Sequence, residues 1–196
     1  MITFAIHAWE GRTTRGWHPL KEEFERRGVL CRIVSTPKRE RETQTPNQDR
    51  ARIMVDALRD VEGDVGLIGI SNQGLFMPLV AAGRPVRRIV MVNGVIPFPG
   101  LSFLEGTKGQ RVWRNVVAGM AAEGAPGMAE LCSLTELPAV EWVYISAERD
   151  EAIRPEWEQW AAREYLHVEP VVIPGAGHAE VLKHVGEVVD AAISGL

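Results

Sequence analysis

Six short segments of the chain are rich in branched apolar side chains, and stretches with helical periodicity separate most of them. Runs of this kind are typical of strands that are buried on both faces of a sheet. Strands that alternate with helices predict an α/β fold, in which helices cover both faces of a parallel sheet. The candidate strands are Ile2 to His7, Cys31 to Ser35, Val65 to Ile70, Arg88 to Asn93, Val140 to Ser146 and Val168 to Ile173.

The third candidate strand leads into Gly69-Ile-Ser71-Asn-Gln73-Gly74, and an apolar helical stretch follows. A serine between a buried strand and a helix matches the G-x-S-x-G nucleophile elbow, which exposes the hydroxyl at the carboxyl end of the sheet. Gln73 replaces the last glycine of that pattern, although Gly74 follows. The alternative role for Ser71 is a helix N-cap, whose oxygen accepts a main-chain N–H.

Two further candidate catalytic residues follow later strands. Asp150 comes shortly after the fifth candidate strand, and His178 ends the stretch Gly175-Ala-Gly-His after the sixth. Ligands of open parallel sheets bind at the carboxyl ends of the strands, so we expect Ser71, Asp150 and His178 at one edge. The chain order Ser, Asp, His is the order of α/β-hydrolases. Order and context together favour a catalytic Ser71 over an N-cap.

These motifs resemble the α/β-hydrolase superfamily, and within it the small esterases and lyases. Ile2 to Trp9 is similar to the strand before the oxyanion loop, although Ala8 stands where the family normally has glycine. Trp17 to Gly28 is similar to the helix that follows, and Gly175 to His178 is close to the family's Gly-x-Gly-His.

The resemblance implies a three-layer α/β/α sandwich with a mostly parallel six-stranded sheet, a minimal form that lacks the family's first two strands. It further implies a single domain, residues 1–196, with a short helical lid inserted at about residues 95–138. No cofactor is expected, because the chain has neither G-x-G-x-x-G nor a Walker pattern, and its histidines and cysteines lack metal-binding spacing.

The resemblance also implies roles. Ser71 would be the nucleophile, His178 the base, and Asp150 the acid that orients the imidazole. Glu148 and Glu151 are neighbours that could serve in its place, but the family puts its acid at the distance of Asp150 from Pro155. The oxyanion hole would be the main-chain N–H groups of Trp9 and Asn72. The candidate residues of the substrate pocket are Trp9, Gln73, Phe98, Phe103, Leu104 and Trp113; the alternative for the lid residues is that they fill the lid's own core.

The composition limits the partners. A formal net charge of −4 and a pI near 5.8 argue against nucleic-acid binding. The sequence shows neither a signal-peptide pattern nor an apolar run long enough for a membrane span, and its two cysteines fit a reduced protein, so a cytoplasmic location is expected. The expected partner is a small-molecule substrate with an apolar part, and a homodimer stays open.

The leading functional hypothesis is a serine hydrolase that cleaves a small carboxylic ester, thioester or lactone through an acyl-enzyme. A lyase or cyclase of the same fold is an alternative, with Ser71 and His178 as a proton-transfer pair; its lysine would have to be Lys108, the one lysine of the lid. A non-catalytic ligand receptor is a third hypothesis, because Gln73 replaces the glycine that the nucleophile elbow normally has.

Overall fold

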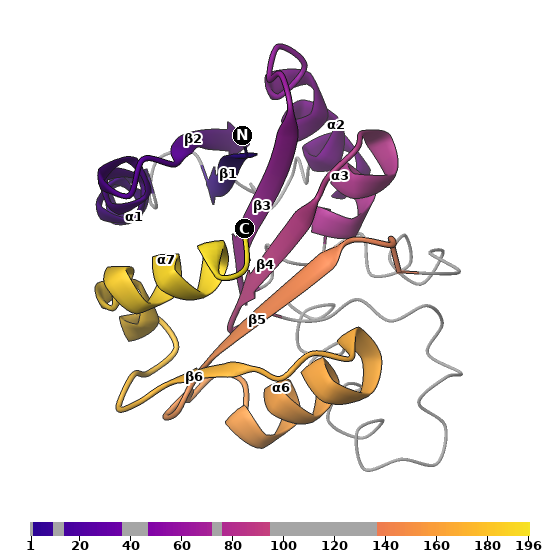
Figure 1. Cartoon of the computed structure of the whole chain (residues 1–196). Helices are drawn as coiled ribbons and strands as arrows, with labels where there is room; N and C mark the ends of the chain where they lie inside the picture. The colour runs from indigo at the N-terminus through magenta and orange to yellow at the C-terminus, as the bar shows by residue number, and fades with distance from the viewer. Residues whose placement is uncertain (1, 10–13, 37–46, 72–75, 95–136) are drawn as a thin grey trace, which may run out of the picture.

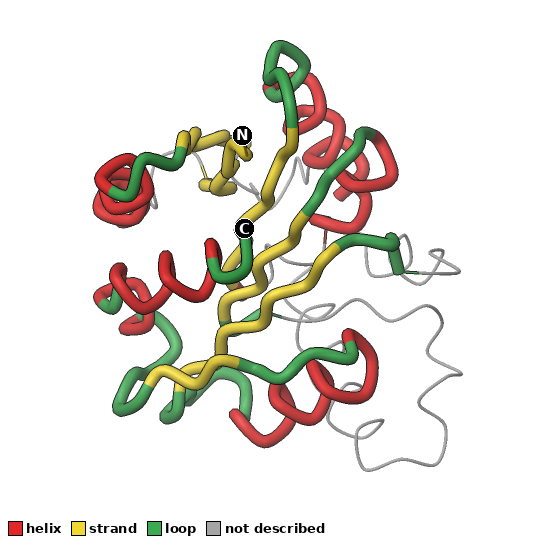
Figure 2. Tube along the Cα trace, viewed as in Figure 1, coloured by secondary structure: helices red, strands yellow, loops and turns green. Residues whose placement is uncertain are grey.

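The computed structural model describes residues 2–9, 14–36, 47–71, 76–94 and 137–196. These residues form a six-stranded sheet with the order β2-β1-β3-β4-β5-β6, and every neighbouring pair is parallel. Figure 2 shows the strands side by side with helices on both sides. The strands are β1 (Ile2–Trp9), β2 (Leu30–Thr36), β3 (Asp64–Ile70), β4 (Arg88–Val92), β5 (Glu141–Ala147) and β6 (Val171–Ile173).

Helices cover both faces of this sheet, so the predicted three-layer fold class is confirmed. Helices α1 and α7 pack on one face, whereas α2, α3 and α6 pack on the other (Figure 1). The helices are α1 (Thr14–Arg26), α2 (Asn47–Ala57), α3 (Met77–Gly83), α6 (Pro155–Ala161) and α7 (Val185–Ile193), with a π-helical turn η3 (Ala162–Leu166) and a 3-10 turn η4 (Glu180–Lys183).

Two predicted boundaries differ from the structure by three residues. Strand β6 begins at Val171 instead of Val168, just after Pro170. Proline has no N–H to donate to a strand ladder, which explains why the strand is short. Helix α1 begins at Thr14, before Trp17, so Pro19 lies inside the helix and not in its first turn.

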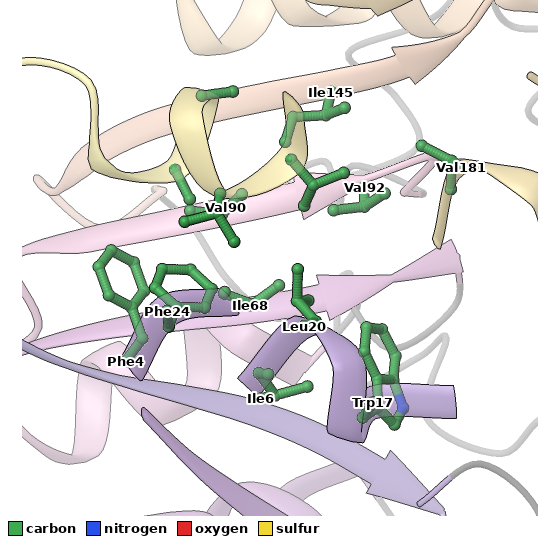
Figure 3. Close-up of a cluster of buried hydrophobic side chains, with 14 of the residues drawn as sticks. Phe4, Ile6, Trp17, Leu20, Phe24, Ile68, Val90, Val92, Ile145 and Val181 are labelled. Carbon is green, nitrogen blue, oxygen red and sulfur yellow. The ribbon is translucent and has the colours of Figure 1, made fainter. Parts of the chain in front are cut away.

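The core beneath α1 fixes the amino-terminal half of the sheet. Trp17, Leu20 and Phe24 of α1 are at most 1% exposed and face Phe4 and Ile6 of β1 (Figure 3). Full burial of a large apolar side chain stabilises a fold by about 1.5–3 kcal/mol. Trp17 therefore serves the core of the domain.

The same core continues to the carboxyl-terminal segment. Ala176 and Val181, on either side of His178, are at most 1% exposed and belong to this cluster. Their burial anchors the segment that carries the histidine. Within the described ranges, each helix is too short or too polar to span a lipid bilayer.

Candidate active site

Ser71 directly follows β3 and has a left-handed backbone, with φ of 53°. A residue other than glycine rarely adopts positive φ, and such strain gathers at functional sites. The nucleophile elbow of a hydrolase requires a strained turn of this kind after a strand. Helix α3 has Phe76 at its N-cap position, so Ser71 is not the N-cap of that helix.

Asp150 and His178 form a direct pair. Oδ2 of Asp150 lies 2.6 Å from Nδ1 of His178, and the side chain of Asp150 is fully buried while that of His178 is 18% exposed. Oδ1 of Asp150 accepts hydrogen bonds from the main-chain N–H groups of Ala152 and Ile153, both at 2.7 Å. Both carboxylate oxygens are thus held in place. An imidazole held at Nδ1 presents Nε2 for proton transfer.

The two other acidic residues of this loop contact the main chain of the histidine segment. Glu148 Oε2 accepts the N–H of Gly175 at 2.7 Å, and Glu151 Oε2 accepts the N–H of His178 at 3.0 Å. Asp150 is therefore the one of the three whose carboxylate contacts the imidazole ring. The longer side chains of Glu148 and Glu151 hold the loop that presents the ring.

Asn93 is a site residue that the sequence pattern predicts only as the end of a strand. It follows β4, is fully buried and has a left-handed backbone, with φ of 44°. Its Nδ2 donates to the carbonyl oxygen of His178 at 2.9 Å, and its Oδ1 accepts the N–H of Ala147 at 2.7 Å. Asn93 thus links the ends of β4 and β5 to the histidine. A lone asparagine at a strand end carries no sequence signal for this role.

The strand order brings the candidate residues to one edge. Strand β4 lies between β3 and β5. The bond from Asn93 therefore holds the His178 segment at the end of β4, next to the strand that leads into Ser71. On the other side of β3, Ile6 of β1 pairs with Ile68. Trp9 and Ser71 each lie three residues beyond that pair, at the carboxyl ends of adjacent strands.

Several predicted site residues lie outside the described residues, and their predicted roles stay predictions. They are Asn72 and Gln73 of the elbow, and Phe98, Phe103, Leu104, Trp113 and Lys108 of the expected lid. Only the last two residues of the expected lid at 95–138, Leu137 and Pro138, are described.

Solved structures with high similarity to this chain include a mutant of polyneuridine aldehyde esterase, with a TM-score of 0.70, 14% identity and 98% of each chain covered. A pyrethroid hydrolase from Sphingobium faniae JZ-2 has a TM-score of 0.65 at 17% identity, covering 100% of this chain and 98% of that one. An alpha/beta hydrolase enzyme from the metagenome of lagoon sediments at Mar Chica, Morocco, has a TM-score of 0.63 at 17% identity, covering 95% and 86%. The chain has the α/β-hydrolase fold. No family model matches it, and no curated protein matches it significantly.

The opposite end of this α/β-hydrolase fold has a different chemistry. A groove of about 770 Å³ lies near the amino ends of β1 and β2, and its wall includes two ion pairs, Lys21 with Glu25 and Arg32 with Asp60. Cys31 also lines it, but burial raises the pKa of that thiol to about 12. A thiol with so high a pKa is a poor nucleophile at neutral pH. Among the described side chains, no group of three or more His, Cys, Asp or Glu could hold a metal ion.

Proposed function

We propose that this protein is a serine hydrolase that cleaves a small carboxylic ester, thioester or lactone through Ser71, His178 and Asp150. The contact between Asp150 Oδ2 and His178 Nδ1, at the sheet edge where the strained Ser71 follows β3, carries the proposal. Acyl transfer by a serine hydrolase requires a nucleophile, a base close to it and an acid that orients the base.

In the proposed reaction, the hydroxyl of Ser71 attacks the substrate carbonyl while Nε2 of His178 takes its proton. The proton then passes to the leaving group, whose bond to the carbonyl carbon breaks and leaves an acyl-enzyme. Water attacks the acyl-enzyme, again through His178, and releases the acid and the free serine. Asp150 keeps the imidazole in the correct tautomer and stabilises its charged form. The N–H groups of Trp9 and Asn72 would stabilise the negative oxygen.

The similar structures support ester cleavage as the reaction class. Their names describe one as an esterase and another as a pyrethroid hydrolase. Since one fold carries many functions, this support concerns the chemistry and not the particular substrate. The proposal includes a substrate with an apolar part and a cytoplasmic location.

Labelling with a fluorophosphonate probe tests the proposal most directly. We expect peptide mapping to find the label on Ser71 and to find none in Ser71→Ala. His184→Ala is the matched control for His178→Ala, because His184 contacts Glu187 instead of Asp150. His178→Ala should lose both labelling and hydrolysis of p-nitrophenyl acetate, whereas His184→Ala should keep both.

Other outcomes of this experiment would reject the hydrolase. Wild-type protein that takes no label and hydrolyses no aryl ester would favour the ligand receptor. Label on Ser71 without any ester hydrolysis would favour a lyase that uses the serine and histidine for proton transfer only.

A further inference from the structure

Glu158 is a buried carboxyl group directly behind the loop that carries Asp150. It lies on α6 and is only 2% exposed. Its Oε2 accepts a hydrogen bond of 2.7 Å from Oγ of Ser146, which is fully buried near the end of β5. This bond connects the strand before the loop, residues 148–154, to the helix after it. The loop that presents Asp150 is therefore closed at its base by Glu158.

The surroundings of Glu158 suit a neutral acid. Its Oε1 has no hydrogen-bond partner among the described residues, and no described arginine or lysine forms an ion pair with it. The hydroxyl of Tyr144 lies beside the carboxyl group but donates its single proton to the carbonyl oxygen of Gly94. Among the described residues, the carboxyl group thus has one unpartnered oxygen and no ion pair, and both favour its neutral form.

Charge leads to the same state. Burial raises the pKa of Glu158 to about 9, the hydrogen bond from Ser146 opposes this rise, the nearby negative charge of Asp150 adds to it, and the contact with Tyr144 opposes it. The titratable groups that act on Glu158 within the described part of the chain are Asp150 and Tyr144. An ionised Glu158 would put a second buried negative charge near Asp150, and two buried like charges repel each other.

We propose that Glu158 is a positioning residue for the Asp150–His178 pair, a neutral acid that fixes the loop at residues 148–154 without a second charge beside Asp150. The inference rests on the proposed function, since it concerns the pair that would act on Ser71. Small displacements of a catalytic pair lower the rate strongly. Ionisation of Glu158 is therefore expected to disturb the pair, and its neutral isostere is expected to preserve it.

The pH profile of ester hydrolysis tests this role. We would measure kcat and KM for p-nitrophenyl acetate from pH 6 to 10.5, corrected for spontaneous hydrolysis, in wild type, Glu158→Gln and Glu156→Gln. Glu156 is an exposed residue of the same helix and serves as the matched control. At pH 7, Glu158→Gln should keep kcat within about twofold of wild type, since one neutral hydrogen bond replaces another. Above about pH 9, wild type and Glu156→Gln should lose kcat while Glu158→Gln keeps it.

A second variant tests the contact itself. Glu158→Leu keeps a side chain of similar volume but removes the hydrogen bond with Ser146. It should lower kcat a few-fold to roughly tenfold with little change in KM. Superimposed alkaline limbs of wild type and Glu158→Gln, or a wild-type kcat in Glu158→Leu, would overturn the inference.

Nuclear magnetic resonance gives a readout that does not need turnover. The Nδ1 proton of His178, shared with Asp150, should give a low-field resonance. We expect it to shift in wild type as Glu158 ionises, to stay constant in Glu158→Gln, and to broaden in Glu158→Leu. A protein that hydrolyses no ester would refute the proposed function, yet this resonance would still test the positioning role. An active protein whose resonance ignores both Glu158 variants would refute the positioning role alone.

Discussion

Asn93 holds His178 through the main chain, since its side-chain Nδ2 donates to the carbonyl oxygen of the histidine at 2.9 Å. The other end of the same amide accepts the N–H of Ala147 at the end of β5. One buried side chain therefore sets the distance between the segment that carries the base and the strand that leads to the acid. This geometry permits a substitution that breaks one bond and keeps the other.

Asn93→Asp should lower kcat for an aryl ester roughly tenfold. Aspartate tolerates the left-handed backbone as asparagine does, and it keeps the acceptor for Ala147 while losing the donor to His178. A buried carboxylate that faces this carbonyl oxygen costs more than the about 1–3 kcal/mol of an unsatisfied neutral acceptor, so urea unfolding should show a loss of at least that size. KM should hardly change, since no substrate contact is removed. A variant with the wild-type kcat would show that this bond does not position the histidine.

Replacement of Ser71 separates chemistry from strain. Both Ser71→Ala and Ser71→Gly should lose at least about a thousandfold in kcat, because removing one member of a triad removes most of the acceleration. At φ of 53°, the glycine variant should be more stable than the alanine variant by about 1 kcal/mol, since glycine alone has no steric penalty there. Urea unfolding of the two variants measures the difference, and equal stabilities would contradict a strained elbow.

Three neighbouring acids offer a matched test of the acid. Asp150→Asn should reduce kcat by several orders of magnitude, about 10⁴-fold in the best-known triad, because an amide favours the wrong histidine tautomer. Glu148→Gln and Glu151→Gln keep an oxygen that accepts the main-chain N–H groups of Gly175 and His178, so their losses should be within about tenfold. The kcat values of the three variants on one ester test this assignment. A larger loss in Glu148→Gln or Glu151→Gln than in Asp150→Asn would mean that Asp150 is not the catalytic acid.

The pH dependence of stability tests the protonation of Glu158. Its pKa in the folded state, about 9 because of burial, lies above the usual 4.5 of the unfolded chain. Folding then binds a proton between these values, so this contribution to stability is complete below the lower pKa and is lost as the pH rises through the higher one. Relative to Glu158→Gln, wild type should lose about 1.4 kcal/mol of unfolding free energy per pH unit inside this window. Urea unfolding at three pH values checks it, and parallel curves would mean that Glu158 is ionised when folded.

The fold class could be predicted from the sequence, and so could the strand ends after which Ser71, Asp150 and His178 lie. Strand and turn preferences depend on residues that are close in the chain. The strand before Ser71 could therefore be predicted from its apolar run, and the chain order of Ser71, Asp150 and His178 is visible in the sequence. Pro155 similarly indicates the start of α6, because proline fits the first turn of a helix. The described strands lie within two residues of their predicted bounds, apart from the shift caused by Pro170.

The contacts that hold these residues depend on the tertiary structure. Glu156 and Glu158 are the same residue type, two positions apart in α6. Only Glu158 is buried, because the face of α6 that carries it packs against β5. Asn93 gained its role from the order of the strands, which puts the end of β4 beside a segment 85 residues away. Burial and long-range hydrogen bonds depend on which surfaces meet after folding, and the residues on either side of a position in the chain do not specify that.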